Sequence, residues 1–147
     1  MLVKDILNCK QKSVVTATTD TTIKAAMELL LTNRISCLPV VDENRQLVGI
    51  ISDKDIFKKV YETPVDYRVF KVDQLMTVDV IVGLPDDELA YIAGLMTNNR
   101  IRHIPILDKD MIIGIVSVGD IVKTQMEHIE IENRYLREYL ASGYPGK

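Results

Sequence analysis

The sequence contains little of what catalytic and metal-binding sites usually require. Its 147 residues include two cysteines, Cys9 and Cys37, and neither belongs to a Cys-x-x-Cys motif or a Cys/His cluster. This argues against a disulfide framework and a metal site, and it predicts two buried, inert thiols. The two histidines, His103 and His128, have no evident catalytic partners, and neither a P-loop nor a G-x-G-x-x-G sequence is present. We therefore expect no enzymatic activity and no catalytic cofactor.

An excess of positive charge and long apolar runs are missing as well. The net charge is −3, so the chain has no broad basic surface for nucleic acid or anionic membranes. Apolar stretches such as residues 111–116 are too short to span a bilayer, and the N-terminus has no signal-peptide core. We expect a cytoplasmic protein that binds neither nucleic acid nor membrane. With 47% hydrophobic residues, it can bury the core of one compact domain or two very small ones.

An internal repeat organises the chain. Residues 33–42, NRISCLPVVD, return as residues 99–108, NRIRHIPILD, with five of the ten positions identical. A second block, GIISDKDI at residues 49–56, returns as GIVSVGDI at residues 114–121. Because the two blocks recur in the same order, the chain contains two copies of one unit. The predicted divisions are a first module at 1–62, a linker at 63–68, a second module at 69–124, and a C-terminal helix and tail at 125–147.

The pattern within each copy predicts mixed helices and strands. Each copy should begin with a short strand, at residues 14–16 or 80–82, and continue into a helix with Asp20 or Asp86 as its N-cap. In the first copy, the predicted hairpin strands are 37–41 and 47–51, and a second helix follows from about 53 to 61. One face of the first predicted helix is apolar and should be buried. The residues on that face are Ile23, Ala26, Met27 and Leu30.

These repeated blocks resemble those of the cystathionine-β-synthase (CBS) domain pair, also called a Bateman module. The resemblance rests on RISCLPVVD and GIISDKD in the first copy, and on RIRHIPILD and GIVSVGD in the second. It implies an α/β (α+β) fold: a tandem CBS pair with pseudo-two-fold symmetry, small sheets flanked by helices, and a C-terminal helical extension. It also implies a regulatory, ligand-sensing function, with clefts at the seam between the two copies that commonly hold an adenine nucleotide.

The block Gly-h-h-Ser-x-x-Asp, where h is apolar, supports two interpretations. Where the strand ends and a helix begins, the carboxylate of Asp120 or Asp55 can accept hydrogen bonds from both ribose hydroxyls of a ligand. The same Ser-x-x-Asp spacing also forms an N-terminal capping box, which needs no ligand. The family resemblance favours the ligand interpretation, and the serine can serve both purposes.

The two copies differ at the position where the family usually contacts phosphate. Arg102 and His103 in the second copy correspond to Ser36 and Cys37 in the first. Arginine and histidine can both donate hydrogen bonds to phosphate oxygens. The alternative is that Arg102 is a solvated strand residue and His103 a half-buried one. We expect the Asp120 cleft to be the main nucleotide site, and the Asp55 cleft to be empty or to hold another ligand.

The resemblance implies that each cleft draws on both copies, and that the ligand is AMP, ADP, ATP, NAD or an S-adenosyl compound. We expect AMP, with ATP, ADP or NAD as possibilities. The predicted residues of the main cleft are Val14, Val15, Ile35, Ser36, Arg102, His103, Ser117 and Asp120. Those of the second cleft are Val80, Ile81, Ile101, Ser52 and Asp55, and Arg102 is expected there too. The competing hypothesis is a non-catalytic interaction or dimerisation module with vacant clefts.

The C-terminal segment is predicted to be a helix from about Asp120 with one apolar stripe, interrupted by Asn133. Its apolar members are Val122, Met126, Ile129, Leu136 and Leu140. The stripe can pack either on its own module or on a partner chain. With the family resemblance, it predicts a homodimer formed through the CBS pair and this helix. No effector domain is evident, so the regulated protein is expected to be a separate partner of unknown identity.

Overall fold

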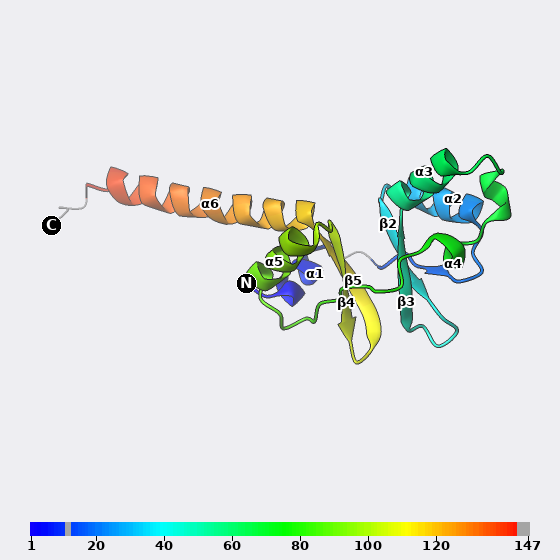
Figure 1. Cartoon of the computed structure of the whole chain (residues 1–147). Helices are drawn as coiled ribbons and strands as arrows, with labels where there is room; N and C mark the ends of the chain where they lie inside the picture. The colour runs from blue at the N-terminus through cyan, green and yellow to red at the C-terminus, as the bar shows by residue number, and fades with distance from the viewer. Residues whose placement is uncertain (11–12, 144–147) are drawn as a thin grey trace.

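Two small sheets, one from each repeat, form the centre of the molecule (Figure 1). The computed structural model describes residues 1–10 and 13–143. In the first sheet, β1 (Ala17–Thr18) runs parallel to β2 (Cys37–Val41), which pairs antiparallel with β3 (Leu47–Ser52). In the second, β4 (His103–Asp108) pairs antiparallel with β5 (Met111–Ser117). The predicted hairpins are confirmed, and the fold is the predicted mixture of helices and small sheets.

The predicted first strand of each copy is corrected by the structure. Strand β1 begins at Ala17, which pairs with Val40, and residues 14–16 belong to no strand. In the second copy, residues 80–82 are also unpaired, and a single parallel bridge joins Gly83 to Ile106. The apolar residues that suggested strands, at 14–15 and 80–81, instead line the clefts described below. Their partial burial comes from that position and not from strand pairing.

Four principal helices cover the sheets. They are α2 (Ile23–Asn33), α3 (Asp53–Glu62), α5 (Leu89–Asn99) and α6 (Val118–Ala141). The predicted N-caps of α2 and α5 were wrong by two residues, because a turn precedes each helix. Thr22 caps α2 by accepting from the Ala25 N–H, and Glu88 occupies the equivalent position in α5 without a side-chain cap. Asp20 instead accepts from the Thr18 hydroxyl within the turn.

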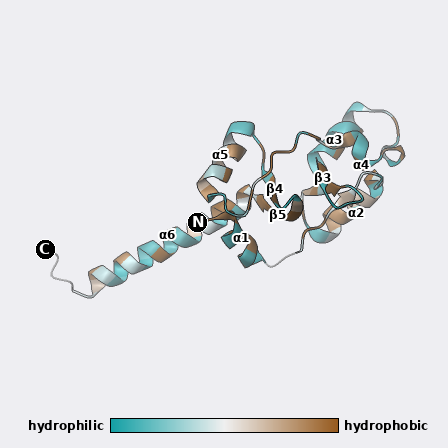
Figure 2. Ribbon diagram, turned by 90° about the horizontal axis from the view of Figure 1, so that it is seen from below, coloured by the Kyte–Doolittle hydropathy of each residue, from teal (hydrophilic) through white to brown (hydrophobic). Residues whose placement is uncertain are grey.

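The apolar side chains of each repeat pack into a separate core. In Figure 2 the strands are largely brown, the colour of hydrophobic residues, and the helices alternate between brown and teal. In the first core, Ile23, Ala26 and Leu30 of the predicted helix stripe are buried, and Met27 is partly buried against them. The stripe prediction is confirmed.

Helix α2 and helix α5 end in the same way. Arg34 and Arg100 both adopt left-handed backbone conformations, with φ of 53° and 54°, which is a common way to terminate a helix.

The N-terminal segments of the two repeats are exchanged. Helix α1 (Val3–Lys10) packs on the second module, where Val3 and Ile6 belong to the core built around β4 and β5. The segment before the second repeat does the reverse, because η1 (Tyr67–Val69) and α4 (Val72–Leu75) pack on the first module. Each module therefore takes its first helix from the segment that precedes the other repeat, and these exchanged segments hold the two modules together.

The glycine that opens each Gly-h-h-Ser-x-x-Asp block permits this exchange. A Cβ atom on Gly114 would lie 2.6 Å from Cδ2 of Leu7 on α1. On Gly49 it would lie 2.5 Å from Sδ of Met76 and 3.0 Å from the Thr77 carbonyl oxygen. Glycine is required at both positions because the incoming segment lies directly against the strand.

Helix α6 begins in the second module and then projects away from the body of the protein (Figure 1). Ile121 is its only buried residue, and in the described part of the chain no helix combines the length and apolarity needed to cross a membrane.

The prediction of two buried thiols holds for Cys37 but was wrong for Cys9, which is exposed because it lies on the outer face of α1.

Candidate ligand-binding clefts

The two Ser-x-x-Asp blocks form complete capping boxes. Ser52 accepts from the Asp55 N–H at 3.1 Å, and Asp55 Oδ2 accepts from the Ser52 N–H at 2.9 Å. Ser117 and Asp120 repeat both bonds at the same distances. The capping interpretation is confirmed. The cap fixes each carboxylate where strand and helix meet, with Oδ1 accepting no hydrogen bond from the described residues.

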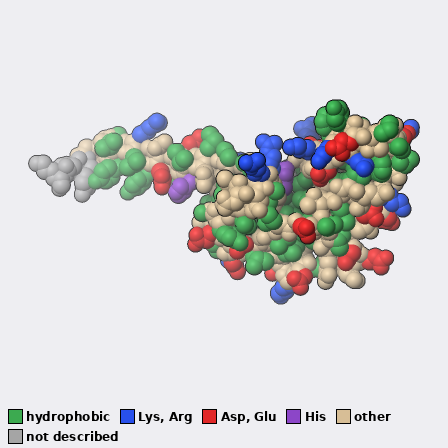
Figure 3. Space-filling model, in the orientation of Figure 1, with side chains coloured by type: hydrophobic (Ala, Val, Ile, Leu, Met, Phe, Trp, Pro, Cys, Tyr) green, Lys and Arg blue, Asp and Glu red, His purple; other side chains and the backbone are tan. Residues whose placement is uncertain are grey.

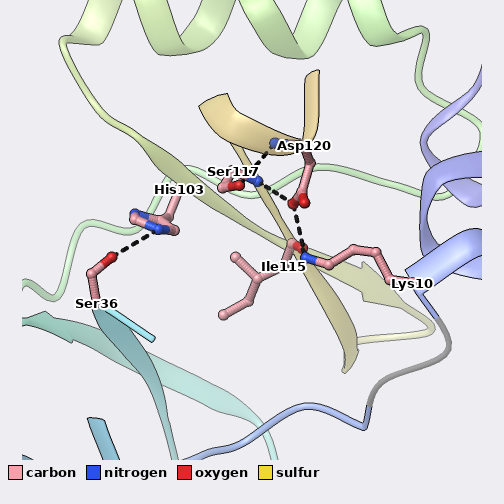
Figure 4. Close-up of polar contacts among 6 residues, drawn as sticks. All are labelled: Lys10, Ser36, His103, Ile115, Ser117 and Asp120. Atoms are coloured by element: carbon pink, nitrogen blue, oxygen red, sulfur yellow. Dashed lines mark hydrogen bonds and ion pairs between the residues drawn. The ribbon is translucent and has the colours of Figure 1, made fainter. Parts of the chain in front are cut away.

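Lys10 approaches the second of these carboxylates from the end of α1. Its Nζ lies 2.8 Å from Asp120 Oδ2 and donates to the Ile115 carbonyl oxygen at 2.9 Å (Figure 4). The side chains are 32% and 21% exposed, respectively. Burial would raise the pKa of Asp120, but the bonds from Lys10 and from Ser117 outweigh it and lower that pKa below its ordinary value. Asp120 is thus held as a carboxylate.

The first module has no counterpart of this ion pair. Helix α4 is shorter than α1 and ends at Leu75, so the chain then runs beside β3 instead of continuing as a helix. The Thr77 N–H donates to the Ile50 carbonyl at 2.9 Å, in the place where Lys10 contacts the Ile115 carbonyl. No cation contacts Asp55 within the described residues. Lys10 is therefore one source of asymmetry between the repeats.

Two clefts lie at the seam between the modules, with volumes of about 960 and 800 Å³. Both are within the range of small-molecule binding sites. We call the first the Lys10 cleft and the second the Asp55 cleft. The described residues that line the Lys10 cleft include Val14, Val15, Ile35, Ser36, His103 and Ser117, all of which were predicted for the main site. The Asp55 cleft is lined by all five of its predicted residues, Val80, Ile81, Ile101, Ser52 and Asp55.

Two residues predicted for the main site lie elsewhere. Arg102, which precedes β4, lines the Asp55 cleft, where it was also expected, and not the Lys10 cleft. Asp120 is not among the described residues that line either cleft, although its carboxylate accepts a hydrogen bond from Lys10, which lines the Lys10 cleft. Sequence reasoning missed Lys10 and Arg34, both of which line the Lys10 cleft.

The two clefts differ in the balance of positive and negative side chains that line them. In the Lys10 cleft, the charged lining residues are Lys10 and Arg34, and no acidic side chain is among the described lining residues. The Asp55 cleft is lined by three carboxylates and three cations. These are Asp53, Asp55, Asp79, Lys54, Arg100 and Arg102. The Lys10 cleft therefore provides the better environment for an anionic group, with Asp120 as a nearby hydrogen-bond acceptor.

A hydrogen bond joins the modules between the clefts. His103 Nε2 and Ser36 Oγ are 3.1 Å apart, and Figure 4 shows the two side chains facing each other from β4 and the segment before β2. Both residues line both clefts. Burial lowers the pKa of His103 below 6.5, and this effect exceeds the opposing influence of Asp120 and Asp53. His103 is therefore predominantly neutral at pH 7.

Cys37 lines both clefts. Burial, reinforced by Asp53, raises the pKa of the Cys37 thiol to about 12, so it is not a nucleophile at neutral pH. Among residues 1–10 and 13–143, no group of three or more His, Cys, Asp or Glu side chains is arranged to hold a metal ion. What the clefts offer is hydrogen-bonding and charged groups around an apolar lining.

The comparison with protein families decides the classification. The CBS domain model matches residues 3–62 and 72–127. The chain belongs to the CBS domain family. A curated relative, the CBS domain-containing protein CBSX3, mitochondrial, of Arabidopsis thaliana, is 31% identical over 150 residues, covering 97% of this chain and 73% of the relative. The CBS domain-containing protein YhcV of Bacillus subtilis is 29% identical, with 86% of each chain covered.

Solved structures of CBS domain pairs share this fold. A CBS-domain containing protein from Agrobacterium tumefaciens superposes with a TM-score of 0.80 at 30% identity, covering 85% of this chain and 99% of that one. The CBS domain pair of protein MJ0100 in complex with 5′-methylthioadenosine and S-adenosyl-L-methionine has a TM-score of 0.76 at 32% identity, covering 87% and 98%. The two compounds bound by the MJ0100 pair both contain adenosine.

Several relatives are larger enzymes. Inosine-5′-monophosphate dehydrogenase of Methanocaldococcus jannaschii is 36% identical over 113 residues, and this chain spans 22% of its length. The likeness therefore concerns only a minor part of that enzyme.

Proposed function

We propose that the protein is a non-catalytic regulatory sensor that binds an adenine nucleotide, AMP in the first place, in the Lys10 cleft. The observation that carries this proposal is that Lys10 and Arg34 line this cleft, and that the Asp120 carboxylate is bonded to Lys10. These three residues combine two cations for a phosphate with a fixed carboxylate for a ribose. The adenosine compounds bound by the MJ0100 pair support the same ligand class.

The unused hydrogen-bond donors and acceptors of the site suit a ribose 5′-phosphate. Oδ1 of Asp120 can accept from a ribose hydroxyl while Oδ2 keeps its bonds to Lys10 and Ser117. An ammonium group has three N–H donors, and Lys10 uses two of them within the protein. The third can donate to a ligand oxygen. Ser36 and His103 provide further hydrogen-bonding groups at the inner end of the cleft.

A ligand bound at the seam can signal by favouring one relative orientation of the modules. Its effect is limited by the difference in its affinity for the two orientations. The exchanged helix α1 extends this coupling, because Lys10 joins the cleft to the helix that packs on the second core. We propose that the response is transmitted to a separate effector protein, that the chain acts as a homodimer, and that it resides in the cytoplasm.

A thermal-shift screen with adenosine and AMP tests the ligand class, because the two compounds differ only in the phosphate. At a ligand concentration 100-fold above Kd, a ligand specific for the native state stabilises it by about 2.7 kcal/mol. We expect AMP to raise the melting temperature more than adenosine at equal concentration. An unchanged melting temperature with AMP, ADP, ATP, NAD and S-adenosylmethionine would instead support an interaction module with vacant clefts.

A further inference from the structure

The stripe on α6 is apolar and the described part of the chain leaves it uncovered. The side chain of Ile121 is buried and anchors the helix in the second module, whereas the stripe beyond it is solvent-exposed. Exposed fractions are 49% for Val122, 57% for Met126, 54% for Ile129, 53% for Leu136 and 75% for Leu140. Figure 3 shows hydrophobic side chains along the projecting helix. Packing of this stripe on its own module, one of the two sequence-based alternatives, is thereby contradicted.

The spacing of the stripe is that of a coiled coil once Asn133 is included. Successive positions 122, 126, 129, 133, 136 and 140 are separated by four, three, four, three and four residues. This is the alternation of a heptad repeat in which Met126, Asn133 and Leu140 occupy a positions, and the other three occupy d positions. Residues 122–140 form about 27 Å of helix at a rise of 1.5 Å per residue.

We propose that residues 122–140 form a parallel two-stranded coiled coil with the same residues of a second copy of this chain. The inference deepens the proposed homodimer by assigning the geometry of its helical contact. Asn133 sets the orientation, because a positions face each other in a parallel pair and two asparagine amides can hydrogen-bond across the axis. A single asparagine at an a position specifies register and a two-stranded state, at some cost in stability.

The flanking charges fit the same arrangement. In a parallel coil, a g residue lies next to the e residue of the following heptad on the other helix. Here the g residue Glu132 and the e residue Arg137 carry opposite charges, so the pair occurs twice across the axis. Arg137 has no ion-pair partner within the described residues. Ile131 is exposed on the outer face, at an f position, and is 67% exposed.

A matched pair of variants tests the contact. Ile129→Asp places a charge in the proposed seam, whereas Ile131→Asp places the same charge on the outer face of the same helix. By sedimentation equilibrium, we expect the first variant to weaken dimerisation at least ten-fold and the second to leave it unchanged. Circular dichroism melting of both variants checks that the modules remain folded.

The outcomes separate the coiled coil from the homodimer. A dimer whose dissociation constant is equally unaffected by both substitutions would overturn the coiled coil and leave dimerisation through the CBS pair standing. A wild-type chain that stays monomeric at micromolar concentration would overturn both.

Orientation is tested by cysteine cross-linking in a Cys9→Ser background. Met126→Cys and Leu140→Cys lie at opposite ends of the proposed coil, about 21 Å apart along the helix. In a parallel pair each variant alone should form an intermolecular disulfide under mild oxidation. If neither variant cross-links alone but a mixture of the two does, the helices are antiparallel and the proposal is wrong.

Discussion

Lys10 and Asp120 are separated by most of the chain, yet their side chains form a 2.8 Å ion pair at the edge of the larger cleft. The pair exists because α1 packs on the module to which it does not belong in sequence. It joins the strand-to-helix junction of the second repeat to the N-terminal helix, and a ligand in the cleft would contact both.

The first prediction concerns the two capping carboxylates. Asp120→Ala and Asp55→Ala each remove the same capping hydrogen bond, which contributes about 1 kcal/mol to stability. Asp120→Ala also removes the ion pair with Lys10, so it should be the more destabilising of the two. Only Asp120→Ala should also weaken AMP binding, by ten-fold or more, which corresponds to 1.4 kcal/mol. Calorimetric titration and urea unfolding of both variants measure the two effects. Equal AMP affinity in both variants would reduce Asp120 to a capping residue.

The second prediction concerns the cation on α1. Lys10→Met keeps the length and packing of the side chain but removes its charge, so AMP affinity should fall five- to fifty-fold while adenosine affinity changes much less. Lys4→Met is the control, since Lys4 lies on the same helix in an exposed ion pair with Asp86. If Lys10→Met weakens AMP and adenosine equally, Lys10 positions Asp120 and does not contact the phosphate.

The third prediction tests the exchanged helix. Gly114→Ala should destabilise the protein because the new methyl group meets the side chain of Leu7, and overpacking typically costs about 1–3 kcal/mol. Since Leu7 supplies all three of the close contacts at that position, Leu7→Ala should relieve the overlap. A double-mutant cycle measured by urea unfolding should show a favourable coupling of about 0.5–3 kcal/mol. Strictly additive effects would mean that α1 does not pack there in solution.

The fourth prediction follows from the lowered pKa of His103. Between its folded pKa and the unfolded value of about 6.5, the unfolded chain binds more protons, so stability rises with pH in that window. The contribution is complete above the unfolded pKa and is lost as pH falls through the folded pKa. His103→Gln should flatten the pH dependence of the urea midpoint between pH 7 and pH 5. A variant with the wild-type slope would show that another group is responsible.

The local structure was predictable where the pattern depended on neighbouring residues. The hairpin from Cys37 to Ser52 was predicted from two apolar runs joined by a polar turn, and the buried face of α2 was predicted from helical spacing. The Ser-x-x-Asp capping boxes were one of two interpretations that the sequence allowed, and the structure contains both boxes. The start of α2 was misassigned because Asp20 and Thr22 are both good N-cap residues, and the turn geometry that decides between them is not visible in sequence.

The contacts between distant segments were not predictable. Nothing near Lys10 indicates that its partner is Asp120, although Val3, Ile6 and Lys10 share one face of α1 and that face could have been marked as inward. Arg102 was expected mainly at the Asp120 side because of its position beside His103. It lies one residue before β4 and lines only the Asp55 cleft, whereas His103 lines both clefts.

The central claim is that the Lys10 cleft binds an adenine nucleotide, and titration calorimetry of the full chain with AMP and with adenosine tests it most directly. We predict saturable AMP binding at the Lys10 cleft, with at least ten-fold weaker affinity for adenosine, and loss of that difference in a Lys10→Met, Arg34→Met double variant. No measurable heat or saturation with AMP at millimolar concentration, or equal affinities for AMP and adenosine in the wild type, would contradict the account.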